Sequence, residues 1–253
     1  MPLHLEGIMK QPIAPEDLQE TVEELYNTPT SSFSSINRFY HLRTEMVDEN
    51  TGDIIGHFVL SVIRNEKADR NDVVDTDLSF KSDEPVRLWF EQMAGPTVYG
   101  SQGYEAITLD DDIDEQYLYL ETVNRYTDYP NLNTHEADVY ISVFPKEVSM
   151  YDSMEALNAA TGKEYSDRFI EECEDVSFLT GTVQSVRDVK MVKGKLDMRF
   201  VLADVKTVLG TVPVAMSRDV FDIDGIAPGR VLAMKAHISA DLASDEVFTY
   251  HDK

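Results

Sequence analysis

The sequence is poor in cysteine and in long apolar runs. Its 253 residues include one cysteine, Cys173, which excludes an internal disulfide and any zinc site built from several thiolates. No stretch approaches the roughly 18 apolar residues of a membrane-spanning helix, and no apolar segment of a secretory signal follows Met1. These absences predict a soluble, cytoplasmic protein with no membrane partner.

Positive charge is also scarce. The chain has 22 Lys and Arg against 47 Asp and Glu, a net charge of −25. Residues 176–253 hold ten charges of each sign, which leaves 37 acidic and 12 basic residues for residues 1–175. Net charge governs solubility and choice of partner rather than fold. The imbalance disfavours nucleic acid and permits a basic protein partner, divalent cations or an acidity without a specific role.

Residues 176–253 show strand patterns throughout. Leu196, Met198 and Phe200 alternate with polar residues after a turn at Lys193-Gly194, and a period of two buries one face of a strand and leaves the other wetter. Five short strands with their longest connection between the third and fourth match an OB-type barrel in number and spacing, and an SH3-like or other Greek-key barrel fits nearly as well. The five runs are residues 178–192, 196–203, 212–216, 232–240 and 247–250.

Residues 1–175 predict a mixture of helices and strands. A β-hairpin is expected around the glycine-containing loop 48–52, and residues 65–77 are expected to form a surface loop. Helices are expected to begin at Pro15, at Asp83, at Asp152 and near Tyr165. The sequence therefore predicts an α+β protein: an acidic, tyrosine-rich α+β domain over residues 1–175, followed by a five-stranded β-barrel domain over residues 176–253.

No common catalytic or cofactor motif is present. Gly162-Lys163 precedes Glu164 rather than the Ser or Thr of a phosphate-binding loop, and the acidic run 110–115 lacks the glycine of a calcium loop. We therefore assign no catalytic, cofactor-binding or metal-binding residue and expect no cofactor. Whether the protein is an enzyme stays open.

A few histidines are weak candidates for acid–base chemistry or for half of a metal site. His135 lies beside Glu136 and Asp138. His41 and His57 lie on paired strands, and they become cross-strand neighbours if paired positions sum to 98; a sum of 100 pairs His57 with Arg43 instead. Surface histidines without a specific role are the plainer interpretation for all three.

The remaining chemical signal is a basic hairpin in the predicted barrel. Its cations outnumber Asp188 and Asp197 by three, and the corresponding loop of OB-type modules contacts nucleic acid. The hairpin offers no outward aromatic residue for base stacking, however, and three net charges neutralise few phosphates. The candidate nucleic-acid-binding residues are Arg187, Lys190, Lys193, Lys195 and Arg199.

The leading hypothesis is a non-catalytic binding or assembly protein that acts through protein–protein contacts or self-association. Nine of the twelve tyrosines lie between Tyr99 and Tyr165, and tyrosine is enriched at interfaces. Nucleic-acid binding by the hairpin is the first alternative, although the net charge disfavours it. A metal-dependent hydrolase using the histidines is the second.

Overall fold

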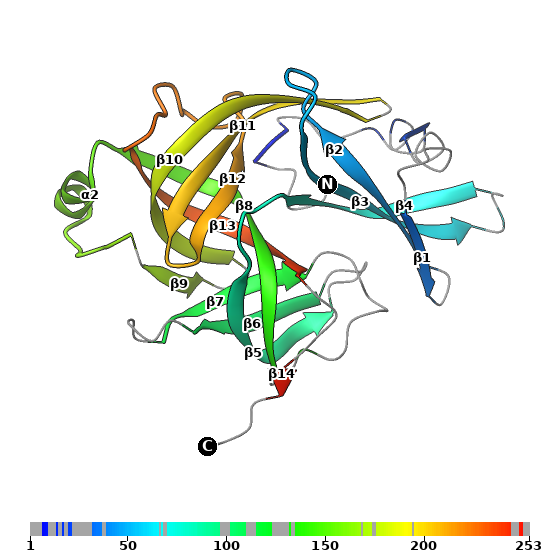
Figure 1. Cartoon of the computed structure of the whole chain (residues 1–253), viewed down its shortest axis with the longest axis horizontal. Helices are drawn as coiled ribbons and strands as arrows, with labels where there is room; N and C mark the ends of the chain where they lie inside the picture. The colour runs from blue at the N-terminus through cyan, green and yellow to red at the C-terminus, as the bar shows by residue number, and fades with distance from the viewer. Residues whose placement is uncertain are drawn as a thin grey trace.

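Strands dominate the fold, and one short helix, α2 (Met154–Thr161), is described in full (Figure 1). The computed structural model describes residues 7–9, 14, 17, 20–21, 32–36, 39–65, 67, 70–96, 102–109, 115–122, 132, 135–167, 169–173, 176–193, 195–243 and 248–249. The prediction of an α+β fold is therefore wrong, because strands make up most of the described chain and two of the four expected helices are replaced by strands. No helix in the described ranges combines the length and apolar character needed to cross a membrane.

A small antiparallel sheet forms first along the chain. Its four strands follow in chain order: β1 (Ser32–Ile36), β2 (Phe39–Val47), β3 (Ile54–Asn65) and β4 (Arg70–Phe80). The predicted hairpin is confirmed by β2 and β3, which pair on either side of the loop. The predicted surface loop 65–77 is wrong, because β4 occupies most of it and pairs with β3 along its length.

The remaining ten strands form one large sheet. Two closed rings of pairings arise within it: β10-β11-β12-β8-β13 and β5-β6-β7-β13-β8, which share the β8–β13 pair (Figure 1). The strands are β5 (Val86–Pro96), β6 (Gln102–Thr108), β7 (Tyr117–Thr122), β8 (His135–Tyr151), β9 (Ile170–Cys173), β10 (Val176–Lys193), β11 (Leu196–Thr207), β12 (Gly210–Met216), β13 (Val231–Leu242) and β14 (Phe248–Thr249).

The predicted barrel of residues 176–253 is wrong in its fifth strand. β14 pairs with the beginning of β8, at Glu136 and His135, and it takes no part in the ring that contains β10 to β13. β8 closes that ring instead, and its 17 residues are long enough for one half to serve each ring. Hydrogen-bonded strand pairs therefore cross the predicted boundary at residue 175, and the division into domains 1–175 and 176–253 stays a prediction.

Two of the predicted helices are strands. Residues from Val86 onward form β5, in which Leu88 and Phe90 are buried while Arg87 and Glu91 are exposed. The expected helix near Tyr165 is replaced by β9, which pairs with β10. Apolar residues spaced for a helix also fit a strand when they are β-branched or aromatic, and here the tertiary pairing decides.

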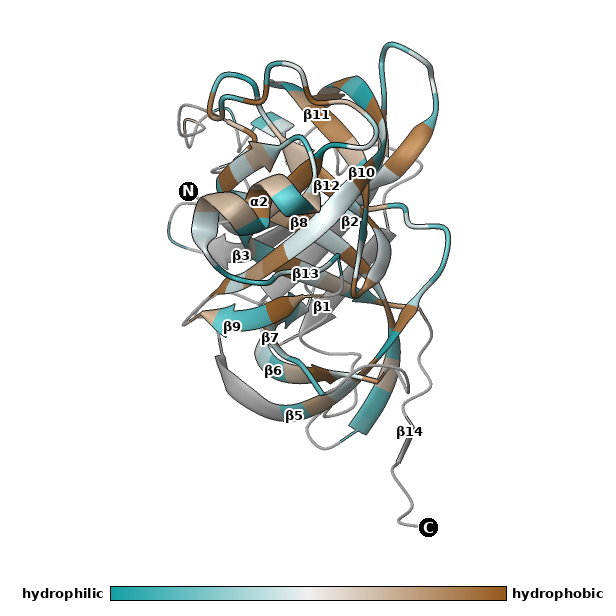
Figure 2. Ribbon diagram, turned by 90° about the vertical axis from the view of Figure 1, so that its left-hand side faces the viewer, coloured by the Kyte–Doolittle hydropathy of each residue, from teal (hydrophilic) through white to brown (hydrophobic). Residues whose placement is uncertain are grey.

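The helix expected at Asp152 is confirmed as α2. Its N-cap is Ser153, whose side chain accepts a hydrogen bond from the Ala156 N–H at 3.3 Å, and Gly162 ends it at φ 70°, a left-handed conformation that favours glycine. Leu157 packs on Val231 of β13, so α2 lies against the ring (Figure 2). The helix expected from Pro15 falls almost entirely outside the described residues.

The described structure has two main apolar cores. The first fills the two rings and includes Leu88, Val139 and Ile238. The second lies between the small sheet and the far half of the β10–β11 hairpin, which reaches over β2 and β3 (Figure 1). There Phe200 of the hairpin stacks at 5.6 Å between ring centroids on Phe80 of β4. This second core fixes the inner face of the hairpin and leaves its outer face for solvent.

Candidate functional site

The predicted site residues fall into three separate places. The basic hairpin borders a groove on the outer face of β10 and β11. His57 lies where the small sheet meets β8 and β13. Residues 135–138 begin β8, beside the outer face of β5, β6 and β7.

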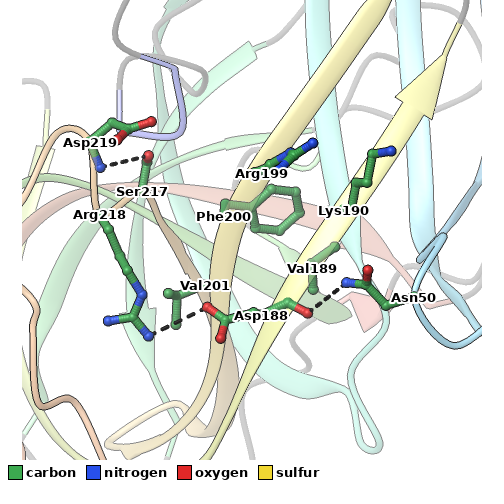
Figure 3. Close-up of a pocket in the computed structure, with 10 residues that line it drawn as sticks. All are labelled: Asn50, Asp188, Val189, Lys190, Arg199, Phe200, Val201, Ser217, Arg218 and Asp219. Atoms are coloured by element: carbon green, nitrogen blue, oxygen red, sulfur yellow. Dashed lines mark hydrogen bonds and ion pairs between the residues drawn. The ribbon is translucent and has the colours of Figure 1, made fainter.

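The groove on the hairpin has a volume of about 390 Å³ (Figure 3). Its floor is formed by β10 and β11, and its sides are formed by Asn50 of the β2–β3 turn and by the loop 217–219. Lys190 and Arg199 line it. The other three predicted nucleic-acid residues do not: Arg187 lines a different cavity, Lys195 Nζ lies 3.3 Å from Glu20 Oε2, and the side chain of Lys193 lies outside the described part.

Lys190 and Arg199 face each other directly across the two strands. The nearest carboxylate to Arg199 is Asp197, with Oδ1 3.9 Å from Nε, and among the described residues none pairs with Lys190 Nζ. Phe200 is 3% exposed, so the groove offers no open ring for base stacking. Both cations lie on the hairpin that the sequence predicted, and their role in nucleic-acid binding stays a prediction.

The two histidines of the first hairpin are not neighbours. Paired positions of β2 and β3 sum to 102, so His57 lies opposite Glu45 and His41 lies opposite Ser61. Neither of the two registers considered from the sequence occurs: the pairing beside the turn, Val47 with Ile54, sums to 101, and a bulge after Met46 raises the sum to 102. This strand pairing does not bring the two histidines together as metal ligands.

His57 belongs instead to a polar network at the junction of the sheets. Arg43 donates to both carboxylate oxygens of Asp241, at 3.2 and 2.5 Å, and its Nη2 lies 3.2 Å from His57 Nδ1. A guanidinium can only donate, so His57 accepts at Nδ1 and carries its ring proton on Nε2. Ser79 Oγ donates to Asp241 at 3.1 Å. The network thus joins β2, β3 and β4 to β13.

At this junction the Ser79 hydroxyl donates to the Asp241 carboxylate, whose two oxygens also accept from Arg43. Within the described ranges no group of three or more His, Cys, Asp or Glu side chains is arranged to hold a metal ion. The sequence missed Asp241 because it lies in an alternating strand with nothing nearby to mark it.

The third place is the outer face of β5, β6 and β7. Alternation on these strands turns Leu88, Phe90 and Leu118 inward. A row of outward positions crosses from Glu136 to Trp89, Ile107 and Tyr117, each opposite the next in the strand register. Trp89, Ile107, Leu109 and Glu115 line a shallow cavity of about 250 Å³ on this face.

Apolar side chains on this face reach solvent. Tyr117 is 44% exposed and Leu109 is 43% exposed, which places both among the most exposed large hydrophobic residues that the structure describes. Trp89, the only tryptophan of the chain, is partly exposed beside them. The helix expected from Asp83 included Trp89, although the alternation of Arg87, Trp89 and Glu91 with Leu88 and Phe90 was the signal that could have placed it outward on a strand.

The same face is strongly acidic. The described outward charges of β5 to β8 here are the carboxylates of Glu91, Glu105, Glu115, Glu136 and Asp138 against the guanidinium of Arg87. Burial raises the pKa of the nearby Glu172, and the charges of Glu105 and Glu91 raise it further. Four aspartates, 110–112 and 114, lie between Leu109 and Glu115 in the sequence.

The side chains of the predicted group His135, Glu136 and Asp138 are divided between the two faces of β8. His135 and Glu136 are consecutive in β8, so their side chains point to opposite faces. Asp138 accepts two hydrogen bonds of 2.8 Å from Arg87. These bonds lower the pKa of Asp138 and raise that of Arg87. Arg87 is thus the hydrogen-bond partner that the described residues give Asp138, and a chemical role for this group stays a prediction.

Comparison with models of known protein families gives no match, and comparison with characterised proteins finds no significant relative. The function must therefore be inferred from the geometry of these three places.

Proposed function

We propose that the protein binds a basic segment of a partner protein on the outer face of β5, β6 and β7. The observation that carries this proposal is the row of Trp89, Ile107 and Tyr117 with Leu109, at the centre of an acidic surface. Aromatic residues dominate the buried centres of protein interfaces, and charged residues surround them. The single cysteine favours the cytoplasm as the compartment of the encounter.

The two properties of the face have separate roles in this proposal. The apolar row supplies the area removed from water when an aliphatic or aromatic anchor of the partner docks. Glu91, Glu105 and Glu115 supply a negative field that attracts lysines or arginines beside that anchor. Electrostatic attraction of this kind raises the association rate and selects against acidic partners, and it weakens as salt is added.

Charge also favours a different partner over a second copy docking through this same face. A symmetric dimer brings the same patch of both subunits together. Here it would place the carboxylates of one copy against those of the other, which costs free energy unless cations intervene. Light scattering tests this directly. A dimer that dissociates into monomers when Leu109→Ser is introduced would show that a second copy of the chain occupies this face.

Tryptophan fluorescence tests the proposal, because Trp89 is the only indole of the chain. The full chain is titrated with a short synthetic peptide in which lysines flank leucine and phenylalanine, and with its glutamate-substituted counterpart. We expect the basic peptide alone to shift and quench the emission of Trp89, with micromolar affinity at low salt and a steep loss of affinity as salt is added.

Variants of exposed positions separate this face from others. Leu109→Ser and Tyr117→Ser should each weaken binding about fivefold or more, since loss of an interface anchor costs more than about 1 kcal/mol. Ile54→Ser is the matched control, because Ile54 is 48% exposed on a different sheet. An unchanged Trp89 spectrum with the basic peptide, or equal weakening by Ile54→Ser, would contradict the proposal.

A further inference from the structure

We propose a second, separate site: the groove on the outer face of the β10–β11 hairpin binds a single phosphate group. The groove lies on the other ring of strands from the acidic face and does not depend on it. It concentrates cations in a chain whose net charge is −25. Its residues are Asn50, Asp188, Val189, Lys190, Arg199, Phe200, Val201, Ser217, Arg218 and Asp219.

The first observation is the direct opposition of Lys190 and Arg199. Like charges directly opposite each other on a sheet face destabilise the pair of strands. Asp197 Oδ1 lies 3.9 Å from Arg199 Nε, and Asp188 lies two positions before Lys190 on the same face of β10, so the two opposed cations have carboxylates beside them and not between them. An anion between the two side chains would turn this repulsion into attraction.

The second observation is that the groove is held rigid before any ligand enters. Glu49 N–H donates to the Lys190 carbonyl at 2.8 Å, and the Lys190 N–H donates to Asp48 Oδ1 at 3.2 Å. Val189 and Phe200, which neighbour the two cations in sequence, are buried in the core below. A cation on a fixed backbone loses less conformational freedom on binding, so more of its interaction energy appears as affinity.

Arg218 supplies a third cation from the loop that borders the groove. It lies 3.4 Å from Asp188 Oδ1, and its Nη1 donates to the Ile223 carbonyl at 3.3 Å. Figure 3 shows its side chain directed to Asp188, away from Arg199. Arg218 therefore shapes one end of the groove, and Lys190 with Arg199 form the anion-binding end.

The charge balance of the groove limits the size of the ligand. Lys190, Arg199 and Arg218 line the groove with Asp188 and Asp219, and Asp197 lies 3.9 Å from Arg199, so the groove has no excess positive charge beyond its two opposed cations. Each phosphate of a bound nucleic-acid strand needs its own cation, and stacking needs open aromatic rings. One phosphate fits the two opposed cations, since lysine and arginine both donate charge-assisted hydrogen bonds to phosphate oxygens.

Calorimetric titration of the full chain with three probes tests the site. The probes are inorganic phosphate, adenosine monophosphate and a short single-stranded oligonucleotide without terminal phosphates. We expect the first two to bind in competition with each other. Binding by the oligonucleotide that requires Lys190 and Arg199 would overturn the assignment to a single phosphate group and would identify a nucleic-acid strand as the ligand.

Two neutral variants should weaken phosphate binding without loss of fold. Lys190→Gln and Arg199→Gln each delete a charge-assisted hydrogen bond, and each should weaken affinity about tenfold. Lys206→Gln is the control. Lys206 is an exposed cation on β11, the strand of Arg199, but it does not line the groove. Its Nζ lies 3.9 Å from Asp167 Oδ2. Asp219→Asn should strengthen binding, since it removes a lining carboxylate.

Thermal unfolding without ligand gives an independent readout. Because the two cations repel each other, Lys190→Gln and Arg199→Gln should raise the Tm by about 1 °C, although they weaken phosphate binding. Absence of binding by all three probes would overturn the proposal. So would phosphate binding that survives both substitutions unchanged.

Discussion

Two arginine–aspartate pairs with the same chemistry lie in different regions of the molecule. At the junction of the sheets, Arg43 and Asp241 expose 21% and 6% of their side chains. On the outer face of β5 and β8, Arg87 and Asp138 expose 47% and 28%. In each pair the guanidinium donates to both carboxylate oxygens. Burial is therefore the main difference between them.

That difference decides what each pair does. An exposed pair contributes little stability because water solvates both ions almost as well. A buried pair contributes little in total, yet the loss of one partner is costly because the other charge is left without solvent. We infer that Arg43 and Asp241 fix how the small sheet lies on β13, while the apolar core on the other face of β13 holds the strands together.

Removal of Asp241 should give the largest effect. Asp241→Ala leaves the Arg43 guanidinium without its carboxylate and the Ser79 hydroxyl without its acceptor, and should lower the free energy of unfolding by about 3–5 kcal/mol. Asp138→Ala makes the same chemical change on the outer face and should cost about 1 kcal/mol or less. Urea unfolding followed by circular dichroism measures both.

A double variant sharpens the same comparison. Arg43→Met with Asp241→Leu removes both charges, so it should recover much of the stability that Asp241→Ala loses. If Asp241→Ala costs no more than Asp138→Ala, the junction pair does not hold the sheets in place.

Two buried serines test the junction at a smaller scale. Ser142 and Ser239 lie directly opposite each other on β8 and β13, and each is 1% exposed. Ser142 Oγ accepts a hydrogen bond of 2.8 Å from the Phe80 N–H of the small sheet. Ser239 Oγ has no hydrogen-bond partner among the described residues. The two hydroxyls thus differ in bonding and not in burial.

Alanine should therefore act oppositely at these two positions. Ser142→Ala leaves the buried Phe80 N–H unsatisfied and should cost about 1–3 kcal/mol. Ser239→Ala removes an unsatisfied hydroxyl and should be neutral or stabilising by up to about 1 kcal/mol. Thermal unfolding of both variants measures the difference. Equal destabilisation would show that Ser239 has a partner after all.

The sequence predicted what is local and missed what is distant. The β2–β3 hairpin and the cations Lys190 and Arg199 follow from alternation and a turn, which neighbouring residues determine. Asp241 bonds to a residue 198 positions away, and no local pattern encodes that pairing. The sequence also missed that β8, and not β14, closes the ring. That closure depends on a distant pairing, the parallel contact of Val214 in β12 with Val143 in β8.

Alternation of apolar and polar residues also does not show whether both faces of a strand are buried. In β13 the sequence indicates an apolar face at Ile238 and Ala240, and it places His237 and Ser239 on the wetter face. Both of these are buried, at 2% and 1% exposed, because the small sheet covers that face. A period of two identifies one buried face of a strand. It does not determine whether a second layer covers the other, which depends on elements elsewhere in the chain.

The pH dependence of the exposed pair, Arg87 and Asp138, should give the smallest effect on stability. Hydrogen bonds from Arg87 lower the pKa of Asp138 below its usual 3.8, and partial burial opposes them. A carboxyl with a lowered folded pKa adds stability that is complete above its unfolded pKa and disappears as the pH falls through the folded value. Asp138→Asn should therefore cost at most about 1 kcal/mol near neutral pH and progressively less in acid, as the pH falls below 3.8. Urea midpoints near neutral pH and in acid measure this; a gap that persists in acid would mean that Asp138 acts by packing rather than by charge.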